Sequence, residues 1–299
     1  MPDEPFIRLA LPCTDQDELE EIRAVLATGY LTQGPKVAEF ERLVAARVGS
    51  RYAFAMSSCT TALHLSLVVA GVGPGDEVLV SDFTFPATAN VVVQQGARPV
   101  LVDIDLDTLA MSVDDAATRV TARTKAIVPV HPFGLAADMD PILALAARHG
   151  LAVIEDAATA IGATYWGRPC GSLGQLGCFS FHPRKVITTG EGGMITTSDE
   201  GLAERIRLLR SHGGVHQGRR YSYQAAGYNY RLSDILAALG VAQMRKLDRL
   251  IASKRLLAAR LTERLRRLPG VTPRASRPGA GTSTSRTWCC WMRGWIATG

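Results

Sequence analysis

Residues 52–81 have the sequence YAFAMSSCTTALHLSLVVAGVGPGDEVLVS. Within this stretch, Tyr52–Met56 is an apolar run of strand length, and apolar residues recur at helical spacing across Ser58–Val72. The turn sequence Gly-Pro-Gly-Asp at 73–76 then leads into a second apolar run, Glu77–Ser81. Two strands joined by a helix of this length predict a βαβ unit with parallel strands.

The same alternation of strand-length apolar runs and helical patterns continues to about residue 200. It is typical of an α/β fold with a mainly parallel central sheet flanked by helices. Ligands bind such sheets outside the carboxyl ends of the strands, so we expect the functional residues there. The other predicted strands are Pro99–Asp103, Ala126–Val130, Leu151–Ile154 and a pair at Gly177–Phe181 and Gly193–Thr197, and the other predicted helices are Ala87–Gln95, Asp140–Arg148, Glu200–Leu209 and Ser233 to about Leu268.

The composition is that of a soluble globular protein, with 47% hydrophobic and 20% charged residues among 299. No apolar stretch reaches the ~18 residues of a membrane span, and the acidic start does not resemble a signal peptide, so we expect a cytoplasmic protein without a membrane partner. Six cysteines without a C-x-x-C pair and six dispersed histidines predict no metal site. The usual motifs of P-loop nucleotide hydrolases, Rossmann dehydrogenases, zinc hydrolases and lipases are absent.

Small hydroxyl residues separate the first predicted strand from its helix, in Ser57-Ser58-Cys59-Thr60-Thr61-Ala62. The free N–H groups at a helix N-terminus, with hydroxyl donors and the helix dipole, can bind a phosphate. The alternative is ordinary N-capping by Ser or Thr, which this segment taken alone fits better.

Three further candidate residues follow predicted strands. Asp156 could pair with a protonated ring nitrogen, although a turn or cap Asp is the alternative. Ser180 and Lys185 could serve one ligand, the hydroxyl meeting a phosphate and the amine a carbonyl carbon. A partly desolvated lysine beside another positive charge, here Arg184, can act as a nucleophile, whereas a lone lysine is usually a solvated surface group. We interpret the glycine-rich segment 188–194 as a hairpin that holds Lys185 in place.

Together these features point to one ligand. A phosphate-binding helix start, a carboxylate for a ring nitrogen and a lysine that can form a Schiff base, in this order on one α/β domain, are the contacts that pyridoxal 5'-phosphate needs. Although each feature alone fits an ordinary structural role better, the combination favours cofactor binding. The sequence therefore predicts pyridoxal 5'-phosphate as the cofactor.

The segment FSFHPRKVITTGEGGM at 179–194 resembles the lysine segment of the DegT/DnrJ/StrS family, whose members are fold type I, pyridoxal-phosphate-dependent aminotransferases of nucleotide-linked keto sugars. Similar motifs occur in the family's order at Gly29–Pro35, Asp82–Asn90, Glu155–Ala158 and Gly227–Arg231. The resemblance implies transfer of an amino group from an amino acid, with glutamate as the expected donor, to a keto sugar. The product would enter amino-sugar, polysaccharide or antibiotic-sugar biosynthesis.

The resemblance also assigns roles to single residues. Lys185 would hold the cofactor as a Schiff base and later move a proton at the substrate carbon, and Asp156 would keep the ring nitrogen protonated. The remaining roles are phosphate contacts for Thr60, Thr61 and Ser180, ring stacking for Phe85, and contact with the phosphate of a neighbouring subunit for Asn229.

Two consequences follow from these assignments. The role of Asn229 implies a homodimer with shared active sites. Thr159 stands where the family usually has His or Gln near the ring hydroxyl; it is shorter and cannot make the same contact, so we expect altered tuning of the cofactor.

Alternative functions remain open at this point. A sugar dehydratase of the same family is one, although dehydratases have a histidine where Lys185 stands. An inactive or regulatory remnant is another. A nucleic-acid-binding role is a third. It rests only on residues 245–299, which contain 13 Lys or Arg and two Asp or Glu. We expect no nucleic-acid partner for the body of the chain.

The C-terminal end differs in composition from the rest. Residues 270–299 have no helical or strand period and hold three of the four tryptophans. We predict a large cofactor-binding domain at 1–245, a helix at 246–269 leading into an incomplete small C-terminal domain, and a tail at 270–299 that is not a native domain. A shifted reading frame or a truncated gene end would explain this tail, and an ordinary flexible tail is the alternative.

Overall fold

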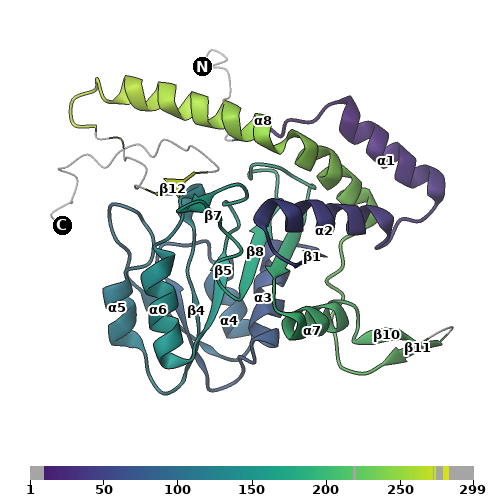
Figure 1. Ribbon diagram of the computed structural model, residues 1–299, viewed down its shortest axis with the longest axis horizontal. Helices are drawn as coiled ribbons and strands as arrows, with labels where there is room; N and C mark the ends of the chain where they lie inside the picture. The colour runs from purple at the N-terminus through teal and green to yellow at the C-terminus, as the bar shows by residue number, and fades with distance from the viewer. Residues whose placement is uncertain (1–9, 218–219, 272, 274–278, 283–299) are drawn as a thin grey trace, which may run out of the picture.

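The computed structural model describes residues 10–217, 220–271, 273 and 279–282 (Figure 1). Its centre is a seven-stranded sheet in the order β1-β9-β8-β5-β4-β2-β3. Neighbouring strands from β3 to β8 run parallel, and β9 runs antiparallel to both β8 and β1. The predicted α/β fold is confirmed. The strands are β1 (Tyr52–Met56), β2 (Glu77–Ser81), β3 (Arg98–Val102), β4 (Thr124–Val128), β5 (Ala152–Asp156), β8 (Leu176–Ser180) and β9 (Gly193–Thr197).

Helices cover both faces of the sheet. Because successive strand residues point to opposite faces, Phe54 and Met56 of β1 join an apolar cluster with α3 and α7, whereas Ala53 and Ala55 join a second cluster with α2, α6 and α8. Both clusters consist of buried side chains, so the sheet lies between two hydrophobic cores. The helices are α1 (Gln16–Thr28), α2 (Pro35–Val48), α3 (Cys59–Val69), α4 (Ala87–Gln94), α5 (Val113–Arg119), α6 (Met139–His149), α7 (Glu200–Arg210) and α8 (Asp234–Leu265).

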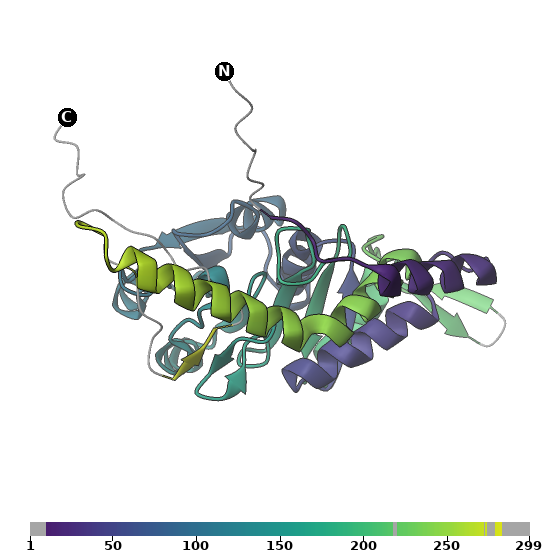
Figure 2. The ribbon, with the colours of Figure 1, turned by 90° about the horizontal axis from the view of Figure 1, so that it is seen from above.

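The long helix α8 extends along one side of the molecule, and α1 and α2 flank its N-terminal half (Figures 1 and 2). Asp234, the first residue of α8, also caps α2, because its carboxylate accepts hydrogen bonds from the backbone N–H groups of Gly34, Lys36 and Val37 at 2.8–3.1 Å. An ionised carboxylate at a helix N-terminus is stabilised by the helix dipole. This contact fixes the N-terminal helices to the domain.

Smaller elements complete the described chain. A hairpin of β10 and β11 projects beyond α7 (Figure 1), and β12 pairs with β6 beside β7. No helix in the described ranges is both long and apolar enough to cross a membrane. These elements are β6 (Thr164–Tyr165), β7 (Arg168–Pro169), β10 (Gly214–Gln217), β11 (Arg220–Tyr223), β12 (Ala280–Gly281) and a 3₁₀ turn, η1 (Pro132–Gly134).

The predicted elements of the sheet agree with the structure. The strands at 52–56, 77–81 and 193–197 have the predicted bounds, and the pair formed by β8 and β9 is antiparallel. The helices α1, α2 and α5 and the β10–β11 hairpin were not predicted. Helix α8 is continuous through residue 245, where we predicted a domain boundary. Most of the predicted tail at 270–299 lies outside the described residues, so this division stays a prediction.

Candidate active site

A cavity of about 560 Å³ lies at the carboxyl ends of β5 and β8, beside the N-terminus of α3. We call it the cofactor cavity. The sequence analysis predicted a site at this edge of the sheet. Six of the eight predicted site residues line the cavity, namely Thr60, Phe85, Asp156, Thr159, Ser180 and Lys185.

The N-terminus of α3 shows the N-capping that was one interpretation of the hydroxyl segment, and phosphate binding stays a prediction. Ser58 caps the helix: its hydroxyl accepts from the N–H of Thr61 at 3.1 Å, and the Thr61 hydroxyl accepts from the N–H of Ser58 at 3.1 Å. Thr60 lines the cavity, where the first N–H groups of a helix lack intrahelical partners. Thr61 does not line it, because its hydroxyl also donates to the Ser58 carbonyl at 2.8 Å. A phosphate contact for Thr61 therefore stays a prediction.

Asp156 ends β5 and is 5% exposed. Its Oδ2 accepts a 2.8 Å hydrogen bond from the hydroxyl of Thr88, and its Oδ1 accepts from the N–H of Ala158 at 3.1 Å. These two donors hold the buried carboxylate in one orientation. Thr88 lies on α4 and was not predicted as a site residue. Only the packing of α4 on the sheet brings it to Asp156.

A second buried carboxylate, Glu155, lies behind Asp156 on β5. It accepts a 2.8 Å hydrogen bond from Nε2 of His131, and both side chains are fully buried. The Nδ1 atom of His131 accepts from the N–H of Ala137 at 3.0 Å, which places the imidazole proton on Nε2. Three backbone N–H groups also donate to Glu155 at 2.7 Å each, those of Gly171, Leu173 and Gly174.

Thr159 connects this buried pair to the cavity wall. Its hydroxyl donates to the carbonyl of His131 at 3.0 Å and accepts from the N–H of Gly134 at 3.1 Å. The same loop carries Phe133, which lines the cavity with a backbone φ of 57° and packs edge-to-face on Phe83 with 5.7 Å between ring centroids. The hydroxyl of Thr159 thus holds this loop while the residue lines the cavity. The expected altered tuning of the cofactor stays a prediction.

The segment 181–193, which we call the lysine loop, carries Lys185. The N–H of Lys185 donates to the carbonyl of His182 at 2.8 Å. The hydroxyl of Thr188 donates to the carbonyl of Phe181 at 2.8 Å, and the N–H of Thr189 donates to the same oxygen at 2.9 Å. These bonds close the loop at its base, as the hairpin interpretation requires, and Lys185 is half-buried against the same cavity as Asp156 and Ser180.

The charges of Asp156 and Lys185 both influence the pKa of the Cys59 thiol, which lies on the first turn of α3. Burial raises the pKa of Cys59, the Asp156 carboxylate raises it further, and the Lys185 ammonium group acts in the opposite direction. The cavity is lined by the buried carboxylate of Asp156, by Glu191 and by the cations Arg184 and Lys185. Charges of both signs suit a zwitterionic ligand with a cationic ring nitrogen and an electrophilic carbon. Phe85 is 74% exposed at the rim of the cavity, so its ring is available to cover such a ligand.

Asn229 lies apart from the other predicted site residues. It is exposed in the segment between β11 and α8, where it forms a bridge with Ser211, and it does not line the cofactor cavity. A contact with the phosphate of a neighbouring subunit is compatible with this position but stays a prediction. In the described part of the chain, no cluster of three or more His, Cys, Asp or Glu side chains could hold a metal ion.

The sequence matches the DegT/DnrJ/EryC1/StrS aminotransferase family over residues 12–293. The chain belongs to this family. It is 46% identical to the GDP-perosamine synthase of Caulobacter vibrioides over 269 residues, which cover 90% of the chain and 72% of that relative. It is also 43% identical to the spore coat polysaccharide biosynthesis protein SpsC of Bacillus subtilis over 278 residues, with the same two coverages.

Solved structures of aminotransferases have the same fold as this DegT/DnrJ/EryC1/StrS member. The aminotransferase TlmJ from Streptoalloteichus hindustanus superposes with a TM-score of 0.89 at 34% identity, covering 93% of the chain and 76% of TlmJ. The PLP form of the sugar aminotransferase Spr1654 from Streptococcus pneumoniae gives 0.87 at 29% identity, covering 93% of the chain and 76% of Spr1654. The predicted fold type, cofactor and reaction class are confirmed.

The residues of the cofactor cavity fit pyridoxal 5'-phosphate. The cofactor needs a phosphate site, an acidic partner for its ring nitrogen and an amine for its aldehyde. The chain provides the N-terminus of α3 with Thr60, the buried carboxylate of Asp156 and the amine of Lys185 around one cavity. This chain is therefore a pyridoxal-phosphate-dependent sugar aminotransferase.

Proposed function

We propose that the enzyme transfers an amino group from glutamate to the keto group of a nucleotide-linked sugar. The placement of Lys185, Asp156 and Ser180 around one cavity carries this proposal. The acceptor class is supported by the likeness to GDP-perosamine synthase, whose name includes a nucleotide, and by the likeness to a polysaccharide biosynthesis protein. We also propose that the enzyme acts in the cytoplasm, as the sequence analysis expected.

Within this proposal, the side chains bind and orient the cofactor and move protons. When bound, pyridoxal phosphate supplies an electron sink for the charge that remains after a proton leaves the substrate carbon. Asp156, oriented by Thr88 and Ala158, keeps a proton on the ring nitrogen. The Nζ amine of Lys185 would hold the cofactor at its aldehyde carbon and would also carry a proton to and from the substrate carbon.

Other cavity residues would hold the phosphate and the ring. Ser180, 8% exposed at the end of β8, and Thr60 would donate their hydroxyl groups to the phosphate, with Thr61 as an additional predicted contact. Phe85 would cover one face of the ring and exclude water from it. Thr159 would border the ring where its hydroxyl already holds the 131–134 turn.

We also propose a homodimer in which Asn229 acts on the cofactor phosphate of the other subunit. Its exposed position outside the chain's own cavity supports a contact in trans. A mixed preparation of Lys185→Ala and Asn229→Ala subunits tests this. If the sites are shared, each hybrid dimer contains one site with both native residues, so each hybrid should have about half of the activity of a wild-type dimer. No recovery on mixing, with hybrid formation verified by native mass spectrometry, would reject shared sites.

The proposed reaction is tested in two halves. Glutamate added to the cofactor-loaded enzyme should convert the visible absorbance band of the bound aldehyde into that of the amine form. A nucleotide-linked keto sugar should then restore the band and yield an amino sugar detected by mass spectrometry. A dehydratase would instead release water from the sugar without consuming stoichiometric glutamate. A chain that binds the cofactor but does not respond to glutamate would be an inactive remnant.

A further inference from the structure

Asn229, the residue of the proposed contact in trans, lies in a short segment that is hydrogen-bonded to two elements of its own subunit. We call residues 228–231 the Asn229 segment. The N–H of Tyr230 donates to the carbonyl of Arg210, at the end of α7, at 3.1 Å. The N–H of Ser57, just after β1, donates to the carbonyl of Tyr230 at 2.9 Å. The segment is therefore fixed between α7 and the end of the strand that leads into α3.

The rings of Tyr228 and Tyr230, on either side of Asn229, stack on each other with 4.8 Å between their centroids and 7° between their planes. Both rings pack against the apolar cluster that β1 and α3 share. Because side chains alternate between the two faces of an extended backbone, the residue between two stacked neighbours lies on the opposite face. Asn229 is accordingly exposed, and no residue in the described ranges forms a hydrogen bond with its side chain. Its amide can therefore bind a group outside its own subunit.

His64, on α3, contacts both tyrosine rings. The residue is only 9% exposed, and its ring lies edge-to-face with Tyr228 at 5.3 Å and with Tyr230 at 5.9 Å between centroids. Its Nδ1 lies 3.2 Å from the Tyr230 hydroxyl. Burial lowers the pKa of His64, which favours the neutral imidazole, and a neutral Nδ1 can accept a hydrogen bond from that hydroxyl. His64 thus holds the ring stack by packing and by a hydrogen bond.

The helix that carries His64 also borders the cofactor cavity of its own subunit. Cys59 and Thr60, in the first turn of α3, line that cavity, and His64 lies on the following turn. The helix therefore contacts the cofactor cavity with its N-terminus and the Asn229 segment with its second turn. His64 itself does not line the cavity, so an effect of this residue on a bound cofactor acts through another group.

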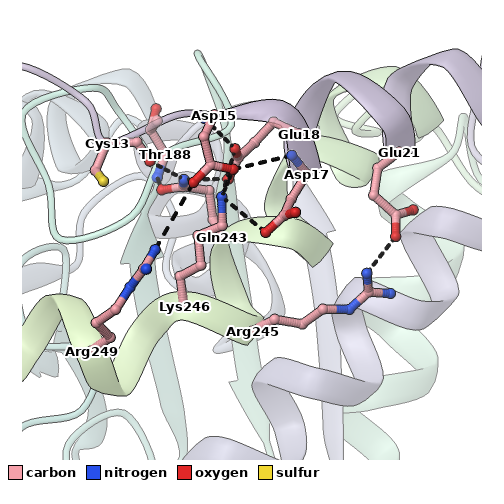
Figure 3. A network of polar contacts seen from close by, with 10 residues as sticks. All are labelled: Cys13, Asp15, Asp17, Glu18, Glu21, Thr188, Gln243, Arg245, Lys246 and Arg249. Atoms are coloured by element: carbon pink, nitrogen blue, oxygen red, sulfur yellow. Dashed lines mark hydrogen bonds and ion pairs between the residues drawn. The ribbon is translucent and has the colours of Figure 1, made fainter.

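The chain after the Asn229 segment is fixed as well, because it leads into α8. The network in Figure 3 joins α8 to α1 and to the lysine loop. The ammonium group of Lys246 lies 2.8 Å from Glu18, and Nε2 of Gln243 donates to the same carboxylate at 2.8 Å. Oε1 of Gln243 accepts from a backbone N–H of the lysine loop at 3.3 Å. With the backbone held on both sides, the ring stack on His64 determines which way Asn229 points.

We propose that His64 is a positioning residue for the cofactor site of the neighbouring subunit: it holds the stack of Tyr228 and Tyr230 and thereby directs the Asn229 amide toward the phosphate bound there. This inference rests on the proposed homodimer with shared sites. The amide NH₂ group of Asn229 is a donor, and the phosphate oxygens are acceptors. The helix that borders the cofactor cavity of one subunit thus also positions a phosphate donor for the other.

The test compares two hybrid dimers of full-length chains, each with one Lys185→Ala subunit and each purified through two different affinity tags. Only the other subunit can then show the visible absorbance band of lysine-bound cofactor, so titration with pyridoxal phosphate measures the affinity of that intact site. In the first hybrid, His64→Leu is in the subunit that keeps Lys185. In the second hybrid, His64→Leu is in the Lys185→Ala subunit, whose Asn229 serves the intact site.

The second hybrid should bind pyridoxal phosphate at least about fivefold more weakly than the first, because leucine keeps neither the edge-to-face contacts nor the hydrogen bond of His64. The first hybrid should match a hybrid with Lys185→Ala alone to within about twofold. Tyr230→Phe, which removes only the hydroxyl and keeps the packing, should give the same order with a smaller difference of about twofold. Equal affinities of the two hybrids, or weaker binding by the first, would overturn the proposal.

His149→Leu is the matched control, because His149 is exposed on α6 and does not line the cofactor cavity. It is the same substitution at a site far in sequence from the Asn229 segment. Placed in the same two arrangements, it should leave the two affinities within about twofold of each other. A difference as large as that of His64→Leu would show that the comparison does not report on His64, and the proposal would be rejected.

The positioning role and the shared site can fail separately. Asn229→Ala, placed in the same two arrangements, tests the shared site directly. If it weakens binding only in the second arrangement while His64→Leu acts equally in both, the positioning role is refuted and the shared site stands. If Asn229→Ala acts equally in both, the shared site and the positioning role are both refuted. The response of the wild type to glutamate, which tests the reaction, is measured independently of either result.

Discussion

Replacing Glu155 by Gln tests how much the hydrogen bonds to this buried carboxylate, which lies behind Asp156, stabilise the fold. The carboxylate accepts from four donors, two at each oxygen. Glutamine has nearly the same shape but only one acceptor oxygen, and its NH₂ group can only donate. Any change in stability therefore reports the hydrogen bonds and not the packing.

Both orientations of the new amide leave donors unpaired. If the NH₂ group faces Leu173 and Gly174, two backbone N–H groups lose their acceptor. If it faces Gly171 and His131, the Gly171 N–H loses its acceptor, and the imidazole can accept from the amide only by moving its proton to Nδ1. That proton then opposes the N–H of Ala137, so three donors are unpaired, and the first orientation, with two, is the less costly one.

The expected cost follows from this count. A buried donor left unpaired costs roughly 1–3 kcal/mol, so two donors cost about 2–6 kcal/mol. For a chain of this length, we expect the Tm to fall by roughly 5–15 °C. Scanning calorimetry of the apoenzyme measures this without interference from cofactor binding.

Glu20→Gln is the matched control, because Glu20 is exposed on α1 and its substitution should change the Tm by no more than about 1 °C. A Glu155→Gln protein that unfolds within about 1 °C of the wild type would refute the reasoning. In that case the four donors would not depend on having two acceptor oxygens at position 155.

Four further outcomes are expected. Lys185→Ala should abolish turnover and leave no borohydride-reducible link to the cofactor, as measured by absorbance and intact mass. Thr88→Val should lower kcat about tenfold and weaken cofactor binding, because Asp156 loses its hydroxyl donor; titration with pyridoxal phosphate checks this. Because burial and Asp156 raise the pKa of Cys59, iodoacetamide should modify this thiol far more slowly at pH 8 than the exposed Cys13, as seen by peptide mass spectrometry. Burial lowers the pKa of His64, so the unfolded chain binds a proton there before the folded chain does; stability should fall as the pH drops below about 6.5, and His64→Gln should reduce this dependence in urea unfolding.

Local sequence patterns predicted the elements whose formation depends on neighbours in the chain. The apolar run Tyr52–Met56 and the turn before Glu77 are such cases, and their strands have the predicted bounds. The capping box of α1, in which Asp15 and Glu18 exchange hydrogen bonds, is also a local signal and was overlooked. The helices α1 and α2 were not predicted from their apolar faces, because these faces pack against the distant helix α8. The cap of α2 is Asp234, which lies 200 positions from Gly34.

The residues of the cofactor cavity also divide into those predicted from local sequence and those whose contacts join distant parts of the chain. Lys185, Asp156 and Ser180 were predictable because each lies at or just past the end of a strand, and strand ends of a parallel sheet meet at one edge. Thr88 could not be assigned to Asp156 from the sequence, since 68 positions separate them. The hydrogen bond between His131 and Glu155 joins residues 24 positions apart, and the one between Gln243 and Thr188 joins residues 55 positions apart. Neither pair could be assigned from the sequence.

By itself, then, the sequence determined the α/β class, the cofactor and the candidate lysine for it, because these follow from short-range periodicity and from motifs with fixed spacing. The tertiary structure alone decided which donors orient the two buried carboxylates and how α3 holds the segment that carries Asn229. Those contacts depend on how helices pack on the sheet, which is set by the shape and burial of surfaces contributed by distant parts of the chain.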